Sequence, residues 1–171
     1  MKLNLGSGDK YRKNYVNVDY CGNPDITHDL SSFPWPFESN SVDEIYSEHF
    51  LEHVNDYERT IKEIHRILKN GGLLAFRVPH WRSPSAVWHL HKQQFSVRTP
   101  WFLCQSVPYQ WNGDQLFENG MLEVFVPCPI FHFALVQKFL NKIATKFASR
   151  WDTYGLPIVE LEFHASKRNV N

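Results

Sequence analysis

Two segments near the start of the chain decide the fold: Leu3-Asn4-Leu5-Gly6-Ser7-Gly8 and Tyr15-Val16-Asn17-Val18-Asp19. Each begins as a short apolar or alternating run typical of a β-strand, and the first ends at a glycine turn, the second at an acid. Taken alone, the glycine turn could equally be a tight turn that binds no ligand. Glycines let a backbone approach a ligand closely, however, and a carboxylate at the neighbouring strand end can accept hydrogen bonds from both ribose hydroxyls. Together the segments predict a nucleoside-binding edge of a sheet.

Strand and helix patterns alternate through the rest of the first half. Further strands are expected at residues 25–30, 41–46 and 73–78. The clearest helix is predicted at 56–69, with Asn55 as its N-cap and Gly71-Gly72 as a left-handed stop. The segment Phe33-Pro34-Trp35-Pro36-Phe37 must be a loop, because each proline removes a donor and restricts the residue before it. This alternation predicts a parallel sheet.

The sequence changes character near residue 80, where a Pro-, Trp- and His-rich stretch runs from His80 to Trp111. Because it follows the fifth strand, it is predicted to form a lid and acceptor pocket. Beyond it we expect a strand at 122–126, a helix whose apolar face is Val136, Leu140, Ile143 and Phe147, and a last strand at 158–164. The outer face of that helix carries basic side chains, which are typical of a solvated surface: Lys138, Lys142, Lys146 and Arg150.

Composition narrows the class of protein. The 171 residues suit one domain, divided into a cofactor-binding half (1–79), a lid insertion (80–121) and a C-terminal strand-helix-strand unit (122–171). Eighteen basic residues balance eighteen acidic ones, so nothing favours nucleic acid as a partner. No apolar run approaches the length of a membrane span or secretory signal, and three scattered cysteines fit a reducing compartment. A cytoplasmic location is expected.

At this point the chain resembles the class I S-adenosylmethionine-dependent methyltransferases, in particular the compact type 11-like group. The segments that carry the resemblance, in the family's order, are Leu3 to Gly8, Tyr15 to Asp19, Asp25 to Leu30, Ser41 to Tyr46 running into Leu51-Glu52-His53-Val54, and Arg66 to Gly72. It covers Lys2 to about Pro79 and implies a Rossmann-like α/β fold, a mostly parallel twisted sheet with helices on both faces.

The resemblance also implies the cofactor, S-adenosylmethionine, whose product is S-adenosylhomocysteine, and the residues that bind it. The glycine turn with Leu5 would pass under the methionine part, Asp19 with Tyr20 would hold the ribose, and Asp29 with Leu30 would bracket the adenine. The residues just past the fourth strand would lie near the transferring methyl group: Ser47, Glu48 and His49. The structural alternatives are that Asp29 caps the following turn and that Glu48 and His53 are helix-start or packing residues.

The glycine turn consists of Leu5, Gly6, Ser7 and Gly8. The turn and the connection that follows it depart from the family pattern in two ways. The usual third glycine is missing, and only ten residues separate Gly8 from Asp19, so the first helix must be short or absent. A dinucleotide-binding enzyme would lose more by this, because its pyrophosphate sits at that helix's N-terminus. The short connection thus favours a methyl donor over NAD.

An enzyme accelerates methyl transfer by aligning donor and acceptor, by excluding water and by placing a base near the acceptor. Histidine suits that base, and His80, directly after the fifth strand, is the first candidate, with His91 second. Either histidine is more readily explained as a structural part of the lid than as the base. The trio of His80, His89 and His91 lacks an accompanying acid, so no metal site is expected.

The leading hypothesis is methyl transfer to an oxygen or nitrogen of a small-molecule acceptor. A non-catalytic S-adenosylmethionine-binding module or partner subunit is the alternative, and a nucleotide-dependent oxidoreductase ranks third. The sequence identifies neither the acceptor, nor the pathway, nor the oligomeric state.

Overall fold

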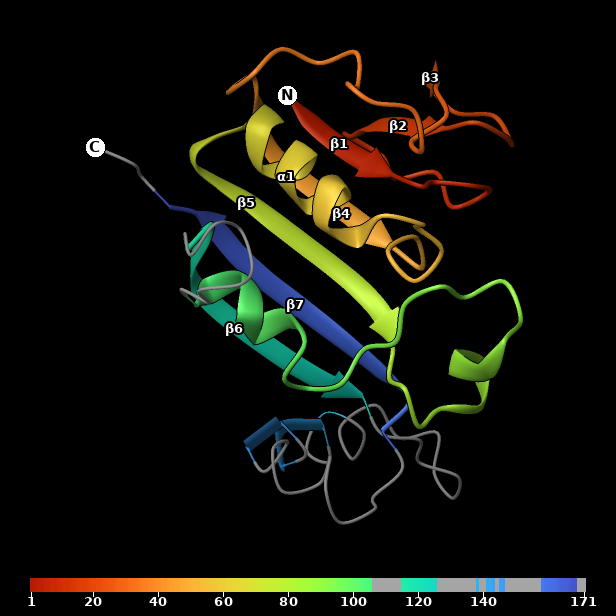
Figure 1. Cartoon of the computed structure of the whole chain (residues 1–171), viewed down its shortest axis with the longest axis vertical. Helices are drawn as coiled ribbons and strands as arrows, with labels where there is room; N and C mark the ends of the chain where they lie inside the picture. The colour runs from red at the N-terminus through yellow and green to blue at the C-terminus, as the bar shows by residue number, and fades with distance from the viewer. Residues whose placement is uncertain (106–114, 126–137, 139–140, 144, 147–157, 169–171) are drawn as a thin grey trace.

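A seven-stranded sheet forms the centre of the computed structural model, with the strand order β3-β2-β1-β4-β5-β7-β6 (Figure 1). The structure describes residues 1–105, 115–125, 138, 141–143, 145–146 and 158–168. The strands are β1 (Lys2–Leu5), β2 (Val16–Asp19), β3 (Ile26–Thr27), β4 (Val42–Glu48), β5 (Leu68–Pro79), β6 (Phe117–Phe125) and β7 (Glu160–Lys167). The helices are α1 (Tyr57–Ile67) and the 3-10 turns η1 (Pro84–Val87) and η2 (Pro100–Cys104).

The first five strands are parallel, as the alternation of strands and helix predicted. Strand β7 runs antiparallel between β5 and β6, so the sheet is mixed on one side. Leu5 of β1 pairs with Ser47 of β4, and Asp19 of β2 pairs with Thr27 of β3. The carboxyl ends of the parallel strands therefore meet at one edge, where α/β sheets bind their ligands.

Helix α1 differs at both ends from the sequence prediction. Its N-cap is Asp56 instead of Asn55, because the Asp56 carboxylate accepts a 2.9 Å hydrogen bond from the Arg59 amide. The helix ends at Ile67, and Leu68 already has extended backbone and begins β5. The glycines therefore do not stop the helix. Gly71 does have a positive φ of 73°, but it lies within the irregular start of β5.

One face of the sheet carries the main core. Isoleucines at the helical spacing of α1 are fully buried, as are Phe76 of β5 and Phe163 of β7, whose rings lie 5.6 Å apart. Turn η2 packs on this same side through Trp101, whose ring meets that of Phe163 edge-on at 5.7 Å. Figure 1 shows α1 and η2 together in front of the sheet. Among the described residues, these elements give one helical layer, and the expected second layer is not seen on the other face between β1 and β5.

The connection from β1 to β2 contains no helix, since residues 6–15, all of them described, form only turns and irregular backbone. This confirms the prediction drawn from the ten-residue spacing. The Pro-rich segment Phe33 to Phe37 is likewise non-helical, as expected.

The later strands are longer than predicted, because β6 begins at Phe117 and β7 extends to Lys167. The predicted helix at 136–147 lies largely outside the described residues, although 138, 141–143 and 145–146 are helical. Its lysines at 138, 142 and 146 are exposed, as a solvated face requires, whereas Arg150 lies outside the described residues. Within the described part of the chain, no helix has the length and apolar character that a membrane crossing demands.

Candidate functional site

The glycine turn begins directly after β1 and is shaped by two left-handed glycines. Gly6 has a φ of 67° and Gly8 a φ of 48°, values that side chains strain to adopt. A Cβ on Gly6 would lie 2.5 Å from the Cβ of Phe50, whereas a Cβ on Gly8 would meet nothing within 4 Å. Gly6 is therefore required by its own packing against Phe50, and Gly8 borders open space.

Asp19 holds this turn in place. Its Oδ2 accepts a 2.8 Å hydrogen bond from the Gly8 amide, and its Oδ1 accepts from the amides of Tyr20 and Cys21 at 2.7 and 3.2 Å. The residue is only 8% exposed. A carboxylate offers about four acceptor positions, so one on Oδ2 is left after these three bonds. The predicted ribose-binding acid thus also ties two strand ends together.

Two serine hydroxyls beside this turn are buried without a hydrogen-bond partner. They belong to Ser7, in the turn, and Ser47, which stands opposite Leu5 across β1 and β4. A buried hydroxyl without a partner costs free energy, and a polar ligand would satisfy it. The hollow next to the turn has a volume of about 250 Å³ and is lined by Gly6, Ser7 and Glu48, among others. These features fit the amino-acid end of S-adenosylmethionine.

The residues predicted at the adenine lie one strand further along the edge. Asp29 is exposed, and its Oδ1 accepts hydrogen bonds from the Ser31 amide at 2.9 Å and the Ser31 hydroxyl at 2.7 Å. These bonds lower the pKa of Asp29 and cap the turn, the alternative weighed from the sequence. Leu30 is buried and Tyr20 is 71% exposed. Both bonds from Ser31 go to Oδ1, so capping of the turn by Asp29 is compatible with ligand binding at its other oxygen.

His49, the first residue after β4, stands between two carboxylates. Its Nδ1 lies 3.0 Å from Oε1 of Glu52, and its Nε2 lies 3.1 Å from Oε1 of Glu160 on β7. The hydrogen bonds to Glu160 and Glu52 raise the pKa of His49 to about 9, so its ring is positively charged at neutral pH. Its φ of 54° is unusual for a residue with a side chain, and such strain is concentrated at functional sites.

A second hollow, of about 440 Å³, opens beside His49. Its lining includes Glu52, His53, Trp88 and His91, so the chain segments 49–53 and 84–91 form its walls. Glu48 lines the first hollow and His49 the second, so adjacent residues at the end of β4 separate the two. The geometry suits a cofactor in one hollow and an acceptor in the other.

The structure separates the two histidines proposed as bases. His91 lines the second hollow and has a buried Nδ1 without a hydrogen-bond partner. His80 is fully buried at the end of β5, where its backbone bridges to Phe95, and it is not among the residues that line this hollow. His89 is exposed. Of the predicted lid aromatics, Tyr109 and Trp111 lie outside the described residues.

Sequence reasoning missed two carboxylates of this site. Glu160 lies 111 residues from His49, and no local motif links them. Glu52 belongs to a segment that carried the family resemblance, yet its complete burial could not be inferred from its spacing. His53, interpreted as a packing residue, also lines the second hollow.

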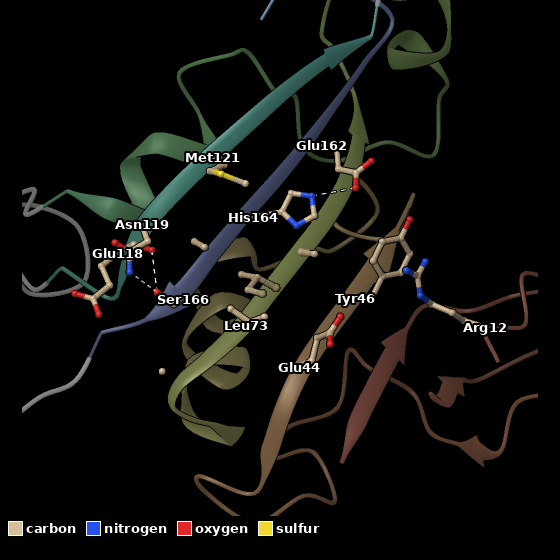
Figure 2. A pocket seen from close by; sticks show the side chains of 14 residues that line it. Arg12, Glu44, Tyr46, Leu73, Glu118, Asn119, Met121, Glu162, His164 and Ser166 are labelled. Atoms are coloured by element: carbon tan, nitrogen blue, oxygen red, sulfur yellow. Dashed lines mark hydrogen bonds and ion pairs between the residues drawn. The ribbon is translucent and has the colours of Figure 1, made fainter. Parts of the chain in front are cut away.

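A third and larger hollow, about 590 Å³, lies on the sheet face opposite α1 (Figure 2). Its lining includes Tyr46, Met121, Glu162 and His164. Glu44 and Leu73, also in the lining, belong to the amino-terminal parts of β4 and β5, away from the strand ends at which α/β sheets bind ligands. Its volume alone does not make it the active site.

Comparison with known proteins agrees with this geometry. A family described as a methyltransferase domain matches residues 9–76, which run from just after the glycine turn into β5. No curated protein matches the chain significantly.

Several solved structures share the fold. An S-adenosylmethionine-dependent methyltransferase from Archaeoglobus fulgidus is 16% identical with a TM-score of 0.63, over 97% of this chain and 85% of that one. A second, from Thermotoga maritima, is 15% identical with a TM-score of 0.60, over 98% and 81%. Phosphoethanolamine N-methyltransferase 2 of Haemonchus contortus, in complex with S-adenosylmethionine, is 14% identical with a TM-score of 0.58, over 99% and 48%.

The structural likenesses establish the Rossmann-like methyltransferase fold. The match of residues 9–76 to the methyltransferase-domain family agrees with this fold, and the Haemonchus contortus neighbour was solved in complex with S-adenosylmethionine.

Proposed function

We propose that the chain transfers a methyl group from S-adenosylmethionine to an oxygen or nitrogen atom of a small molecule bound in the hollow beside His49. The observation that carries this proposal is the pair of unpartnered buried hydroxyls, Ser7 and Ser47, at the ends of β1 and β4. Ser7 belongs to the glycine turn, which borders open space at Gly8, and Ser47 immediately precedes Glu48, at the boundary between the two hollows.

The cofactor assignments follow the strand ends. The methionine part would lie on Leu5 to Gly8 and near Ser47 and Glu48, with the two hydroxyls as hydrogen-bonding groups. Asp19, through the free acceptor position on Oδ2, would bind a ribose hydroxyl, with Tyr20 beside it. Asp29 and Leu30 would contact the adenine. The bound cofactor supplies an electrophilic methyl group on a sulfonium.

The acceptor would occupy the hollow lined by His49 and His91. Its oxygen or nitrogen forms the new bond to the methyl carbon as the carbon–sulfur bond breaks, and its proton must leave. Of the two histidines predicted as bases, we assign proton removal to His91, because it lines this hollow and its Nδ1 is unpartnered. The charged His49 ring, held by the carboxylates of Glu52 and Glu160, fixes the end of β4 that separates the cofactor from the acceptor.

Calorimetric titration with S-adenosylhomocysteine tests cofactor binding, and a screen of hydroxyl and amine acceptors for S-adenosylhomocysteine release tests the reaction. We expect one binding site per chain and release with a subset of acceptors. Binding without release from any acceptor would favour the non-catalytic module instead. No heat with the methyl donor or its product would refute the assignment of the cofactor site.

A further inference from the structure

Three potential metal ligands converge at the inner end of the hollow beside His49. Glu52, His53 and His91 each offer one ligand atom, and the three atoms lie within 4.8 Å of one another. In the sequence, His91 stands near His80 and His89, and that trio has no accompanying acid. In the folded chain, the acid and a second histidine come from the segment after β4.

The Glu52 carboxylate carries the inference. Glu52 is completely buried, its Oε1 faces His49, and its Oε2 has no hydrogen-bond partner. Burying a carboxylate oxygen without any partner is costly, and buried charges are normally paired or coordinate metals. Nδ1 of His91 is also buried and unpartnered. Two buried groups with free lone pairs thus lie in one cluster.

The backbone holds the two walls of the cluster together. The amides of Lys92 and Gln93 donate to the Glu52 carbonyl at 2.7 and 3.0 Å, and the Gln93 side chain donates to the Val54 carbonyl at 3.0 Å. These bonds fix His91 next to residues almost forty positions earlier in the chain. Ligands held by such surrounding bonds are prepared for a metal before it arrives.

The second histidine also has the partner that a ligand needs. Nδ1 of His53 lies 3.4 Å from the Leu90 carbonyl, which favours a tautomer with a free Nε2. Its ring meets that of His91 edge-on, with centroids 4.7 Å apart, and Trp88 packs edge-on against both histidines. These ring contacts hold the two imidazoles side by side.

We infer that Glu52, His53 and His91 form a binding site for a divalent transition-metal ion such as Zn²⁺. Two imidazoles and one carboxylate are a ligand set that suits zinc with its fourth position open. Bonds of about 2.1 Å in tetrahedral geometry place ligand atoms about 3.4 Å apart, so the three side chains draw together on binding.

All three ligands line the same hollow as Ser85 and Val87, so an acceptor in this hollow would reach the open position of a bound ion. If the function proposed above holds, on which this step rests, a donor atom of the acceptor takes that position. The bound ion lowers the pKa of that donor atom, which then releases its proton to water, and this replaces the proton removal assigned above to His91.

The test uses the full-length protein, freed of metal by dialysis against a chelator and titrated calorimetrically with ZnCl2. One site per chain is expected, and Glu52→Gln or His91→Ala should weaken Zn²⁺ binding by roughly a hundredfold or more. His89→Ala is the matched control, because His89 is an exposed neighbour outside the cluster, and it should stay within about twofold. Mg²⁺, which prefers octahedral oxygen ligands, should give no saturable heat.

Co²⁺ provides a second readout, since visible absorption bands from bound Co²⁺ should disappear in His53→Ala. Melting curves of the metal-free variants separate loss of ligand from loss of fold. Absence of stoichiometric Zn²⁺ binding, or binding unchanged in both Glu52→Gln and His91→Ala, would overturn the inference. S-adenosylhomocysteine titrated into the metal-free protein reports separately on the proposed function.

Discussion

Replacing Asp19 by Asn separates the two tasks that the structure gives this residue. In the free protein three amides donate to its carboxylate, from Gly8, Tyr20 and Cys21, and a ribose hydroxyl would add a fourth bond at Oδ2. Asn keeps the shape and one oxygen but loses the charge. Since a hydrogen bond to a charged group contributes about 1.5–3 kcal/mol, affinity for S-adenosylhomocysteine should fall about 10- to 150-fold.

The same substitution should also lower stability, because the amide nitrogen of Asn cannot accept from the Gly8 N–H while its oxygen serves Tyr20. One part-buried donor left unpaired costs about 1–2 kcal/mol, which lowers the melting temperature by about 2–8 °C. Calorimetry measures affinity and a thermal melt measures stability. Asp9→Asn, an exposed acid of the same turn, is the control.

A ligand without ribose hydroxyls then distinguishes direct from indirect effects. Wild type should bind the 2′,3′-dideoxy analogue of S-adenosylhomocysteine weakly, and Asp19→Asn should bind it about as weakly as wild type does. Should the substitution weaken both ligands by the same factor, Asp19 would only hold the glycine turn, and its assignment to the ribose would be wrong.

Two further predictions concern stability. Gly6→Ala should lower the free energy of unfolding by about 2–4 kcal/mol, since its Cβ would lie 2.5 Å from the Cβ of Phe50 and φ is 67°. Gly8→Ala, whose Cβ would enter open space, should lower it by about 1–2 kcal/mol. Equal losses for the two variants in urea melts would contradict the packing at Gly6. The hydrogen bonds from His164 and Arg77 lower the pKa of Glu162 to about 2, so this carboxylate stabilises the fold above its unfolded pKa of about 4.3 and loses that contribution as the pH falls toward 2. His164, whose pKa is raised, is protonated in both states over that range. Glu162→Gln should therefore be less stable than wild type by about 2 kcal/mol at pH 6, and urea melts at lower pH should show the difference shrinking; a constant difference between pH 6 and 2.5 would exclude the pairing.

Local patterns in the sequence predicted most of the first half of the fold. The strand ends at Leu5 and Asp19, the parallel order and the absence of a first helix all depend on short-range features: apolar runs, glycines and the length of one connection. The ends of α1 were predicted less well. Asn55 and Asp56 are both good N-caps, and only the backbone geometry selects Asp56.

The acceptor side depended on contacts that no spacing reveals. Glu52 could be aligned with the family pattern, but its partner Glu160 comes from the antiparallel strand β7, far along the chain. His91 meets Glu52 and His53 because main-chain bonds from Lys92 and Gln93 fold the lid back over the end of β4. Long-range placement of this kind depends on tertiary structure, which explains why sequence reasoning favoured the buried His80.

The missing first helix is replaced by side-chain bonds within the sheet. Asn4 of β1 donates to Oδ1 of Asn17 on β2 at 2.8 Å and to the Lys10 carbonyl at 3.0 Å, and the same Asn17 oxygen accepts from the Arg12 amide at 2.8 Å. Both asparagines are almost fully buried, at 3% and 1% exposure.

Asn4 thus donates to the loop and Asn17 accepts from it, at positions where a helix would otherwise pack. The Arg12 guanidinium of this loop lies 3.7 Å from the centroid of the Tyr46 ring. A short, bonded loop leaves the end of β1 without the helix N-terminus that a pyrophosphate needs. It still provides the glycine turn and the Asp19 carboxylate. The way in which this chain shortens the Rossmann-like unit therefore removes the phosphate-binding element and keeps the parts that suit a sulfonium nucleoside.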